Sequence, residues 1–422
     1  MDVQIYRLNT SFLLFVMAVI CLCAGYPARA QTADTLIENI IQSNPKLQAL
    51  KLEYESASYR QGEFRDLPDP VFSTGFFPLP TETGMSPQRL QIGVSQALPW
   101  NSVLKNRANV VKQEAEMLRY EYDIARSDLW LTLNQIGAQL WQIDQEAALL
   151  EERYPLLESW YQVALARMES YTGASSDVLQ IQSLMNEIKN ALHILEQERK
   201  SYEAQYRRLA GTVKLPDGAD WTKESFKDFI LKPAEDLDAL PDMQWYEQER
   251  KVSEAILERN LTDRLPTLEL GMDYIFVGQM DNPPPGYRKR DILMPIVSVQ
   301  IPIFRKKYKA VEQTEKTRQL AISLHKEDKK REILEQIEQA RITFMKEEMN
   351  LEFYEDQLEI IDHTIEMVSA GYSTRGDKFE ELLRLQNQMI DFNLKKLESK
   401  VNMYMAHLTI ERWQPKNVKN EE

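Results

Sequence analysis

The sequence predicts a mainly helical chain that also carries four strands of the kind found in membrane β-barrels. Apolar residues recur at heptad spacing over several very long segments, whereas four short segments alternate apolar with polar residues. One plan also occurs twice, because a strand pair that ends near Pro99 or Pro302 opens each time into a long helix. The two copies lie about 200 residues apart, which indicates an internal duplication.

The N-terminus predicts export. Arg7 precedes an apolar run over residues 12–24, and Ala28-Arg29-Ala30 forms the small-x-small pattern that a signal peptidase recognises. The run is too short to span a bilayer as a helix. We therefore expect residues 1–30 to be a signal peptide that is removed from the mature protein.

Composition narrows the function classes. Cleavage would remove Cys21 and Cys23, the only two cysteines, and with them disulfides and cysteine-bound metals. An acylated N-terminal cysteine is the alternative, which Ile20 and Leu22 disfavour because a small residue normally precedes the acylated cysteine. A net charge of −14 argues against a nucleic-acid partner, whose phosphates require a basic surface. It does not argue against a β-barrel, in which only half of each strand is apolar.

The four strands are expected at about residues 70–78, 89–98, 266–276 and 292–303. Their lengths are close to those of tilted strands that cross a bilayer, about 9–11 residues. In the third strand we expect Glu269 and Asp273 to face a barrel lumen, and the alternating Leu268, Leu270 and Met272 to face lipid. A half-buried strand of a soluble sheet alternates in the same way, but the rest of this chain is coiled coil and offers nothing else to cover the strands.

The helical pattern is long and regular. Series of apolar residues at spacings of three and four begin at Leu118, Val178, Leu351 and Ile390. A period near 3.5 residues specifies nearly parallel helices packed side by side. We expect one helix from Asn101 to Tyr154, about 80 Å long, and one from Arg305 to Ala370, about 100 Å long. No ordinary globular domain accommodates such rods.

The number of strands predicts the quaternary state. Four strands cannot close a barrel, since the smallest membrane barrels need about eight, and an open sheet edge is not viable in lipid. Three copies would give a 12-stranded barrel and would set their helices side by side as a hollow cylinder. The sequence thus predicts a homotrimer.

Short motifs at the two helix tips and in the first helix carry a resemblance to a known family. The pattern of an aromatic residue, a glycine and a serine or threonine before Asp-Val is matched at the first helix tip by Tyr171, Gly173, Ser176, Asp177 and Val178. The second tip has Tyr372-Ser373, and the first helix carries Asn44-Pro45. In these features the chain resembles the TolC-type outer membrane efflux proteins, closest in build to the heavy-metal branch that includes CusC and CzcC. The resemblance covers the mature chain as two repeats, residues 31–240 and 241–422.

This resemblance implies a fold and a function. It implies a trimeric 12-stranded outer membrane β-barrel, a periplasmic α-barrel and an equatorial belt around residues 215–240 and after His407. The implied role is the passive exit duct of a tripartite efflux system. The implied partners are a periplasmic adaptor, an inner-membrane pump of the RND type and outer membrane lipid, with no cofactor. The cargo stays open among metal cations, drugs and other small molecules.

The two tips are candidate gate and adaptor sites. We expect turns over residues 172–176 and 373–376, each between two helices of a pair. The resemblance suggests that Asp177 and Tyr372 latch neighbouring helix pairs at the periplasmic end. Alternatively, Asp177 only caps its helix and Tyr372 is only a core residue.

Acidic residues near the second tip raise a separate question. Relatives can carry two acids at the narrow end, and the matching positions here hold Glu381 and Arg384, so that one acid is kept and one is reversed. Asp377 and Glu380 are candidate replacements. The alternative is that these acids are solvated charges at a helix start, where the helix dipole favours them.

The sequence contains none of the enzyme motifs that we sought. GxxxxGK, HExxH and GxSxG do not occur, and the four histidines are scattered along the expected helices. We therefore expect neither an enzyme nor a metal site. The second hypothesis for function is an exported periplasmic coiled-coil scaffold that does not enter lipid, which extraction without detergent would reveal.

Overall fold

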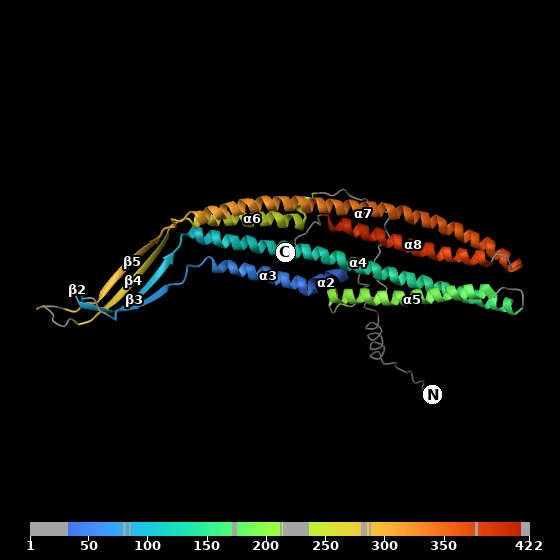
Figure 1. Ribbon diagram of the computed structural model, residues 1–422, viewed down its shortest axis with the longest axis horizontal. Helices are drawn as coiled ribbons and strands as arrows, with labels where there is room; N and C mark the ends of the chain where they lie inside the picture. The colour runs from blue at the N-terminus through green and yellow to red at the C-terminus, as the bar shows by residue number, and fades with distance from the viewer. Residues whose placement is uncertain are drawn as a thin grey trace, which may run out of the picture.

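The computed structural model describes residues 33–78, 82–83, 86–170, 175–211, 213, 236–279, 285–286, 288–375 and 379–414. The elements follow in the order α2 (Ala33–Ser43), α3 (Pro45–Glu63), β1 (Val71–Phe76), β2 (Glu82–Thr83), β3 (Ser86–Leu98), α4 (Asn101–Glu169), α5 (Ser175–Ala210), η2 (Leu237–Ala239), α6 (Pro241–Thr262), β4 (Thr267–Val277), β5 (Ile292–Gln300), α7 (Lys306–Arg375) and α8 (Phe379–Arg412). Figure 1 shows a small sheet at one end and long helices that run away from it.

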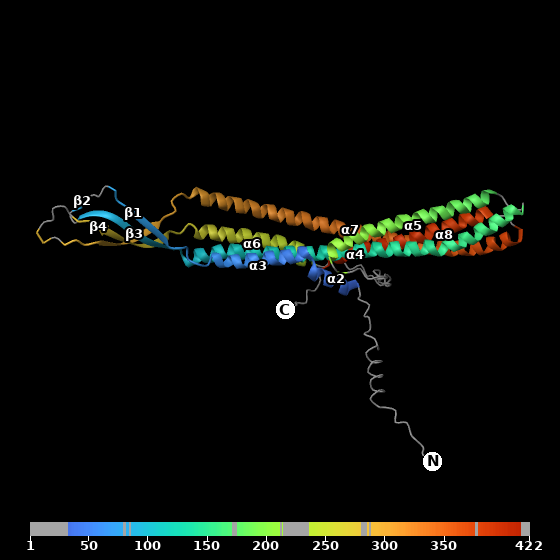
Figure 2. The same cartoon turned by 90° about the horizontal axis from the view of Figure 1, so that it is seen from below.

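The helices lie side by side in a layer with two edges. Next to the sheet, α4 contacts α3 and α6, and α6 contacts α7. Farther from the sheet, α4 contacts α5 and α8, and α8 contacts α7. One edge of the layer is therefore α7 over its whole length, and the other edge is α3 followed by α5 (Figures 1 and 2).

Both of the longest helices, α4 and α7, were predicted, but the predicted C-terminal end of α4 was wrong. α7 spans 70 residues, close to the expected segment. We expected the helix that starts at Asn101 to stop before Pro155, yet α4 continues through this proline to Glu169. Leu150 and Leu157, on either side of the proline, are buried in the same hydrophobic cluster. Packing against α5 and α8 thus outweighs the one helical hydrogen bond that a proline cannot make.

Asn44 and Pro45 separate the first two helices. The Asn44 side chain accepts hydrogen bonds from the backbone N–H groups of Lys46 and Leu47 at 3.0 and 3.3 Å, and Pro45 occupies the first helical position. The same side chain donates to the carbonyl of Leu209 on α5, 2.9 Å away. This cap therefore starts α3 and also ties it to the end of α5.

The sheet confirms the four predicted strands. Its order is β1–β3–β4–β5, every neighbouring pair is antiparallel, and the short β2 pairs only with the start of β3. β3 begins earlier than expected, and β5 stops at Gln300 instead of continuing to residue 303. Within the described chain, β1 and β5 each keep one edge without a partner strand.

Hydrophobic clusters between the helices form the core. The largest ones join α4 to α2 and α5, and α4 to α5 and α8. Smaller ones join α7 to α8 and α7 to η2 and α6. None of the helices described is both long enough and apolar enough to cross a membrane.

Candidate functional site

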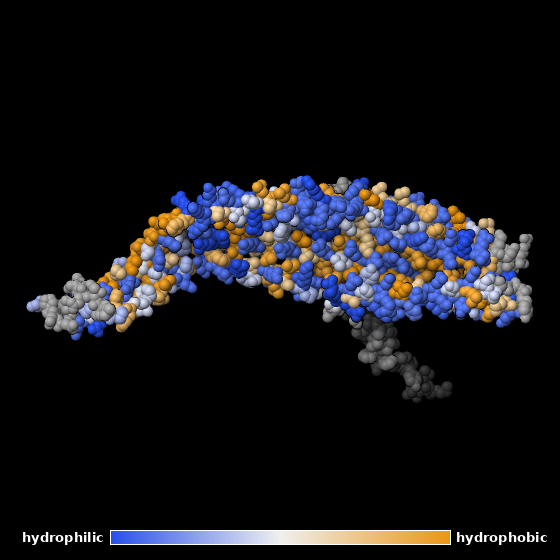
Figure 3. All heavy atoms as spheres, viewed as in Figure 1, coloured by the Kyte–Doolittle hydropathy of each residue, from blue (hydrophilic) through white to orange (hydrophobic). Residues whose placement is uncertain are grey.

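The sheet has one strongly apolar face. Because side chains alternate along a strand, residues paired across the sheet share a face. The pairs Phe72–Val94, Val94–Met272, Ile92–Tyr274 and Tyr274–Leu293 all belong to one face. Large side chains on this face are exposed, including Leu270 at 45% and Met272 at 48%. Figure 3 shows hydrophobic residues gathered along the β5 side of the sheet. An exposed apolar surface of this size requires an apolar environment or a partner.

The opposite face of the sheet carries smaller and more polar side chains, and Asp273 lies near the middle of β4 on this face. Ser73, Gly93 and Asp273 stand in one row across β1, β3 and β4. The Gln91 side chain donates a hydrogen bond to the carboxylate of Asp273, and Asp273 is only 7% exposed. Glu269 lies on the same face, opposite Ala97. The predicted division of β4 is confirmed, since Glu269 and Asp273 lie on one face of the sheet and Leu268, Leu270 and Met272 lie on the other. That their face lines a lumen stays a prediction.

Gly93 allows this polar row to form. A Cβ atom at residue 93 would stand 2.3 Å from Oδ1 of Asp273 and 2.5 Å from Oγ of Ser73. Both distances are shorter than any van der Waals contact, so the two polar side chains cross directly over the glycine. Sequence reasoning did not find this role, because alternation identifies a face but not which neighbour covers a glycine.

The two helix tips lie at the far end from the sheet. The structure corrects the expected turns: Ser176 belongs to the first turn of α5, and Tyr372 and Ser373 belong to the backbone of α7. Helix ends read from a sequence are uncertain by about one or two residues. Here the helices extend farther into both polar segments than we expected, so α5 starts at Ser175 and α7 ends at Arg375. Tyr171, Gly173 and Asp377 lie outside the described residues.

The acidic residues at the tips begin helices. Asp177 stands in the first turn of α5 and accepts a hydrogen bond from the Ser176 hydroxyl at 3.2 Å. Glu380 and Glu381 stand in the first turn of α8, Glu380 exposed and Glu381 half-buried. All three carboxylates therefore stand where the helix dipole favours them, which the alternative interpretation proposed for the two acids on α8.

A groove of about 540 Å³ runs between α5 and α8 close to these tips. Its lining includes Glu187 on α5, and Glu380, Arg384 and Asp391 on α8. Glu380 and the cation Arg384 stand one helical turn apart in this groove. Among the residues that the structure describes, no cluster of three or more His, Cys, Asp or Glu side chains could hold a metal ion. The groove mixes charges of both signs.

Farther along the helices, the carboxyl group of Glu146 on α4 is half-buried. Burial raises the pKa of Glu146 above its ordinary value, and the nearby carboxylates of Glu198 on α5 and Glu398 on α8 raise it further. A hydrogen bond from Gln142, 2.7 Å long, acts in the opposite direction. Three helices thus bring carboxylates to one level of the layer.

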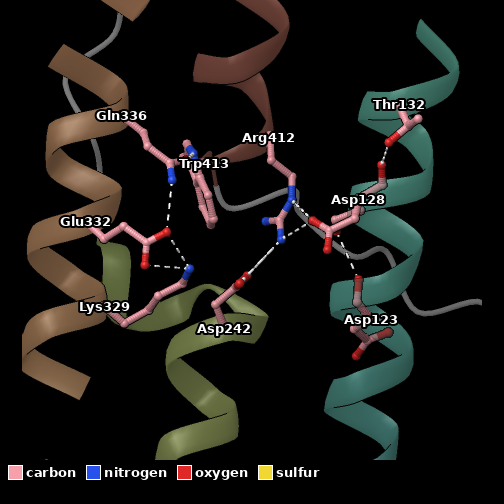
Figure 4. A network of polar contacts seen from close by, with 10 residues as sticks. Asp123, Asp128, Thr132, Asp242, Lys329, Glu332, Gln336, Arg412 and Trp413 are labelled. Atoms are coloured by element: carbon pink, nitrogen blue, oxygen red, sulfur yellow. Dashed lines mark hydrogen bonds and ion pairs between the residues drawn. The ribbon is translucent and has the colours of Figure 1, made fainter. Parts of the chain in front are cut away.

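A buried arginine joins three helices near the middle of the molecule (Figure 4). The Arg412 side chain on α8 is 2% exposed and donates to Asp128 on α4 and to Asp242 on α6. Its guanidinium carbon lies 4.3 Å from the centre of the Trp413 ring, and Trp413 donates to Gln336 on α7 at 3.1 Å. This network was not predicted. It lies in the C-terminal part of the expected equatorial belt, whereas most of residues 215–240 lie outside the described chain.

The comparisons with known proteins agree with this fold. No protein-family model matches the sequence, and no curated protein matches it. Among solved structures, a crystal structure of CusC, studied for folding and transmembrane channel formation, has a TM-score of 0.75 at 14% identity, covering 91% of this chain and 92% of CusC. The outer-membrane channel OprN has a TM-score of 0.72 at 17% identity, with 91% and 89% covered.

The open-state MtrE outer membrane channel of Neisseria gonorrhoeae has a TM-score of 0.71 at 14% identity, with 91% of this chain and 89% of MtrE covered. At such identities the similarity establishes the fold and not the activity. It confirms, at the level of fold, the resemblance to TolC-type channels.

Proposed function

We propose that this protein is the outer membrane exit duct of a tripartite efflux system and that it conducts substrates passively. The observation that carries the proposal is the sheet, which has one exposed apolar face, one polar face and two open edges, and which continues into helices of 69 and 70 residues. A membrane-spanning barrel needs this division of faces. The duct fold of the solved outer membrane channels supports the same role.

The working unit in this proposal is a homotrimer, in which three sheets close a 12-stranded barrel. Open strand edges support it, since neither lipid nor a single copy satisfies them. The α7 edge supports it as well, because large apolar residues on α7 are exposed in one copy. These include Leu320, Leu324, Met349, Phe353 and Met367. The opposite edge exposes Leu52 and Tyr59 on α3 and Leu179 on α5.

The repeated order of elements supports a duplication. Each half consists of a shorter helix, two principal strands, a helix of about 70 residues and a return helix. The return helices α5 and α8 span 36 and 34 residues. Each half thus supplies two strands to the barrel and one helix pair to the periplasmic tunnel. We place the mature N-terminus after residue 30 in this scheme.

Fractionation and conductance test this function. A duct requires detergent for release from the outer membrane fraction, runs as a trimer and gives discrete conductance steps in planar bilayers. A periplasmic scaffold, the second candidate, is released by osmotic shock without detergent and gives no steps. Leu270 and Met272 favour the duct, since a scaffold leaves this apolar face without an explanation.

The proposed partners meet the periplasmic tips. An adaptor protein would contact the tips, and an inner-membrane pump of the RND type would supply the energy. The resemblance to the heavy-metal branch makes metal cations the first cargo to test. Growth of a deletion strain on metal salts and on drugs, with the chain restored as the control, assigns the cargo.

A latch at the tips is the proposed gate. Asp177 on α5 and Tyr372 on α7 are its candidate members, since a phenol that donates to a carboxylate contributes about 1.5–3 kcal/mol. Such an energy biases a two-state opening and can still be overcome by an adaptor. Replacing both, Tyr372→Phe with Asp177→Ala, should raise single-channel conductance in an intact trimer. Unchanged conductance in the folded double variant contradicts the latch.

A further inference from the structure

Two oppositely charged segments lie at the helical end of the sheet, one on each open edge. The basic junction, which follows β5, consists of Arg305, Lys306, Lys307 and Lys309. The acidic link, which precedes β1, carries Glu63, Asp66 and Asp69, with Arg65 between them. All of these residues are exposed. We propose that the basic junction of one copy pairs with the acidic link of the next copy, an inference that rests on the proposed trimer.

Strand topology brings these two segments together only between copies. Within one copy, β3 and β4 separate β1 from β5. Every neighbouring pair in the sheet is antiparallel, so the same rule at the seam pairs β5 with β1 of the next copy in opposite directions. The end of β5 at Gln300 then lies beside the start of β1 at Val71. Because each strand continues there into its charged segment, the segments meet at the foot of the barrel.

Each segment includes charges that are placed against a helix dipole. Lys306, Lys307 and Lys309 stand at the N-terminus of α7, where the dipole favours acids, and the first turn of α7 contains none. Glu63 ends α3, where the dipole favours cations. Helix stability within one copy therefore does not explain the three lysines or Glu63, although Arg60 in the last turn of α3 does follow the dipole. Side by side at the seam, the start of α7 and the end of α3 would place opposite charges and opposite helix poles together.

Ion pairs among the described residues do not engage these charged groups. Among the residues described, no ion pair involves Arg305, Lys306 or Lys309, and the same holds for the three acids of the link. Lys307 differs, because its ammonium lies 4.8 Å from the centre of the Tyr308 ring. The three cations and three acids are thus available to a neighbouring copy.

The other strand-to-helix junction serves as an internal comparison. β3 passes into α4 through Pro99, Trp100 and Asn101, and the first cation of α4 is Lys105. This junction lies inside the sheet, between β1 and β4, and turns from strand to helix without a basic cluster. The turn itself therefore does not require cations. They occur at the junction that lies on an open edge.

Lipid phosphates are the competing partner. Ile301, Ile303 and Phe304 are 62, 70 and 79% exposed and continue the apolar face to the basic junction, so that its cations would stand near headgroups. Figure 3 shows this hydrophobic edge changing to a hydrophilic surface where α7 begins. The acidic link on the opposite edge favours a second copy, because anionic headgroups would repel it.

Charge reversal and its rescue test the pairing. The first variant combines Arg305→Glu, Lys306→Glu and Lys309→Glu, and the second combines Glu63→Lys, Asp66→Lys and Asp69→Lys. Trimer and monomer are quantified by native mass spectrometry of the full chain in a neutral detergent at low salt. We expect each triple variant to lower the trimer-to-monomer ratio by about tenfold, because several exposed pairs are replaced by repulsion. The sixfold variant should return to within about twofold of the wild type.

The control reverses three cations on helices between the two edges, Lys112→Glu on α4, Lys251→Glu on α6 and Lys400→Glu on α8, and should leave the ratio unchanged. The pairing is overturned if the first triple variant lowers the trimer-to-monomer ratio and the sixfold variant does not restore it. It is also overturned if neither triple variant changes the ratio. A loss that appears only in nanodiscs containing phosphatidylglycerol assigns the junction to lipid and also overturns it. A wild-type chain that is monomeric in detergent contradicts the trimer itself, which separates failure of the proposed function from failure of this pairing.

Discussion

Arg412 donates two hydrogen bonds to one carboxylate oxygen of Asp128, from Nε and from Nη2, each 3.0 Å long. The two residues are 284 positions apart and belong to different halves of the chain. Nη2 also donates to the buried Asp242 at 3.1 Å. The last turn of α8 is thereby fixed to α4 and to the start of α6, which holds both halves of the chain together at one level.

Replacing Arg412 should destabilise the protein strongly. In Arg412→Gln the buried Asp242 loses its charged partner, and breaking a buried pair on one side costs about 3–5 kcal/mol. The thermal midpoint in detergent, followed by circular dichroism, should fall by several degrees. Arg208→Gln, at an exposed position on α5, is the matched control and should leave it unchanged. A midpoint of Arg412→Gln equal to that of the control contradicts a structural role for the network.

Gly93 should tolerate no side chain. The added atoms of Gly93→Val would overlap Oδ1 of Asp273 and Oγ of Ser73, so that both polar side chains have to turn away and the polar row is broken. We expect the variant to be lost from the outer membrane fraction, as measured by immunoblot against the wild type. Gly62→Ala is the control, because no atom lies within 4 Å of a Cβ at that position in α3. Normal amounts of Gly93→Val in the membrane would show that the polar row is not needed for the sheet.

The two faces of β4 should respond differently to the same substitution. Leu270→Arg places a charge on the apolar face, which costs about 2–4 kcal/mol at the middle of a bilayer. Glu269→Arg stays on the polar face, where water would solvate the guanidinium. Membrane insertion, measured as heat-stable folded barrel on a gel, should therefore fall for Leu270→Arg only. Equal insertion of the two variants contradicts the assignment of lipid and lumen faces.

Glu146 should make stability depend on pH. Its pKa is raised in the folded chain, so the folded state holds this proton more tightly than the unfolded state does. The stabilising contribution is then complete below the unfolded pKa and is lost as the pH rises through the folded pKa. Glu146→Gln keeps an acceptor for Gln142 and removes the charge. It should raise the thermal midpoint at pH 7 by on the order of a degree, and the difference should vanish near pH 4.

The fold could be predicted because its signals are local. Alternation from Leu268 to Met272 and heptads from Leu118 onward each lie within one segment, and the structure confirms them. The sites could not be predicted equally well, because they depend on contacts between distant segments. An arginine on a heptad helix such as Arg412 has no local pattern that distinguishes it from a solvated one. The helix through Pro155 was missed for the same reason, since packing partners on α5 and α8 decide where α4 ends.

Arg384 stands at a position where the family resemblance implies an acid, and it carries the last prediction. Arg384 lines the α5–α8 groove with Glu187 and Glu380, and it donates to Gln388 at 3.1 Å. If the tips form the narrow end of a trimeric pore, three copies of this cation oppose the passage of cations and three copies of an acid would favour it. Arg384→Glu should therefore shift the reversal potential toward that of K⁺ in a KCl gradient across planar bilayers. Arg208→Glu, an equal charge change near the other end of α5, should not shift it. A reversal potential of Arg384→Glu that stays at the wild-type value would place this residue outside the conduction path.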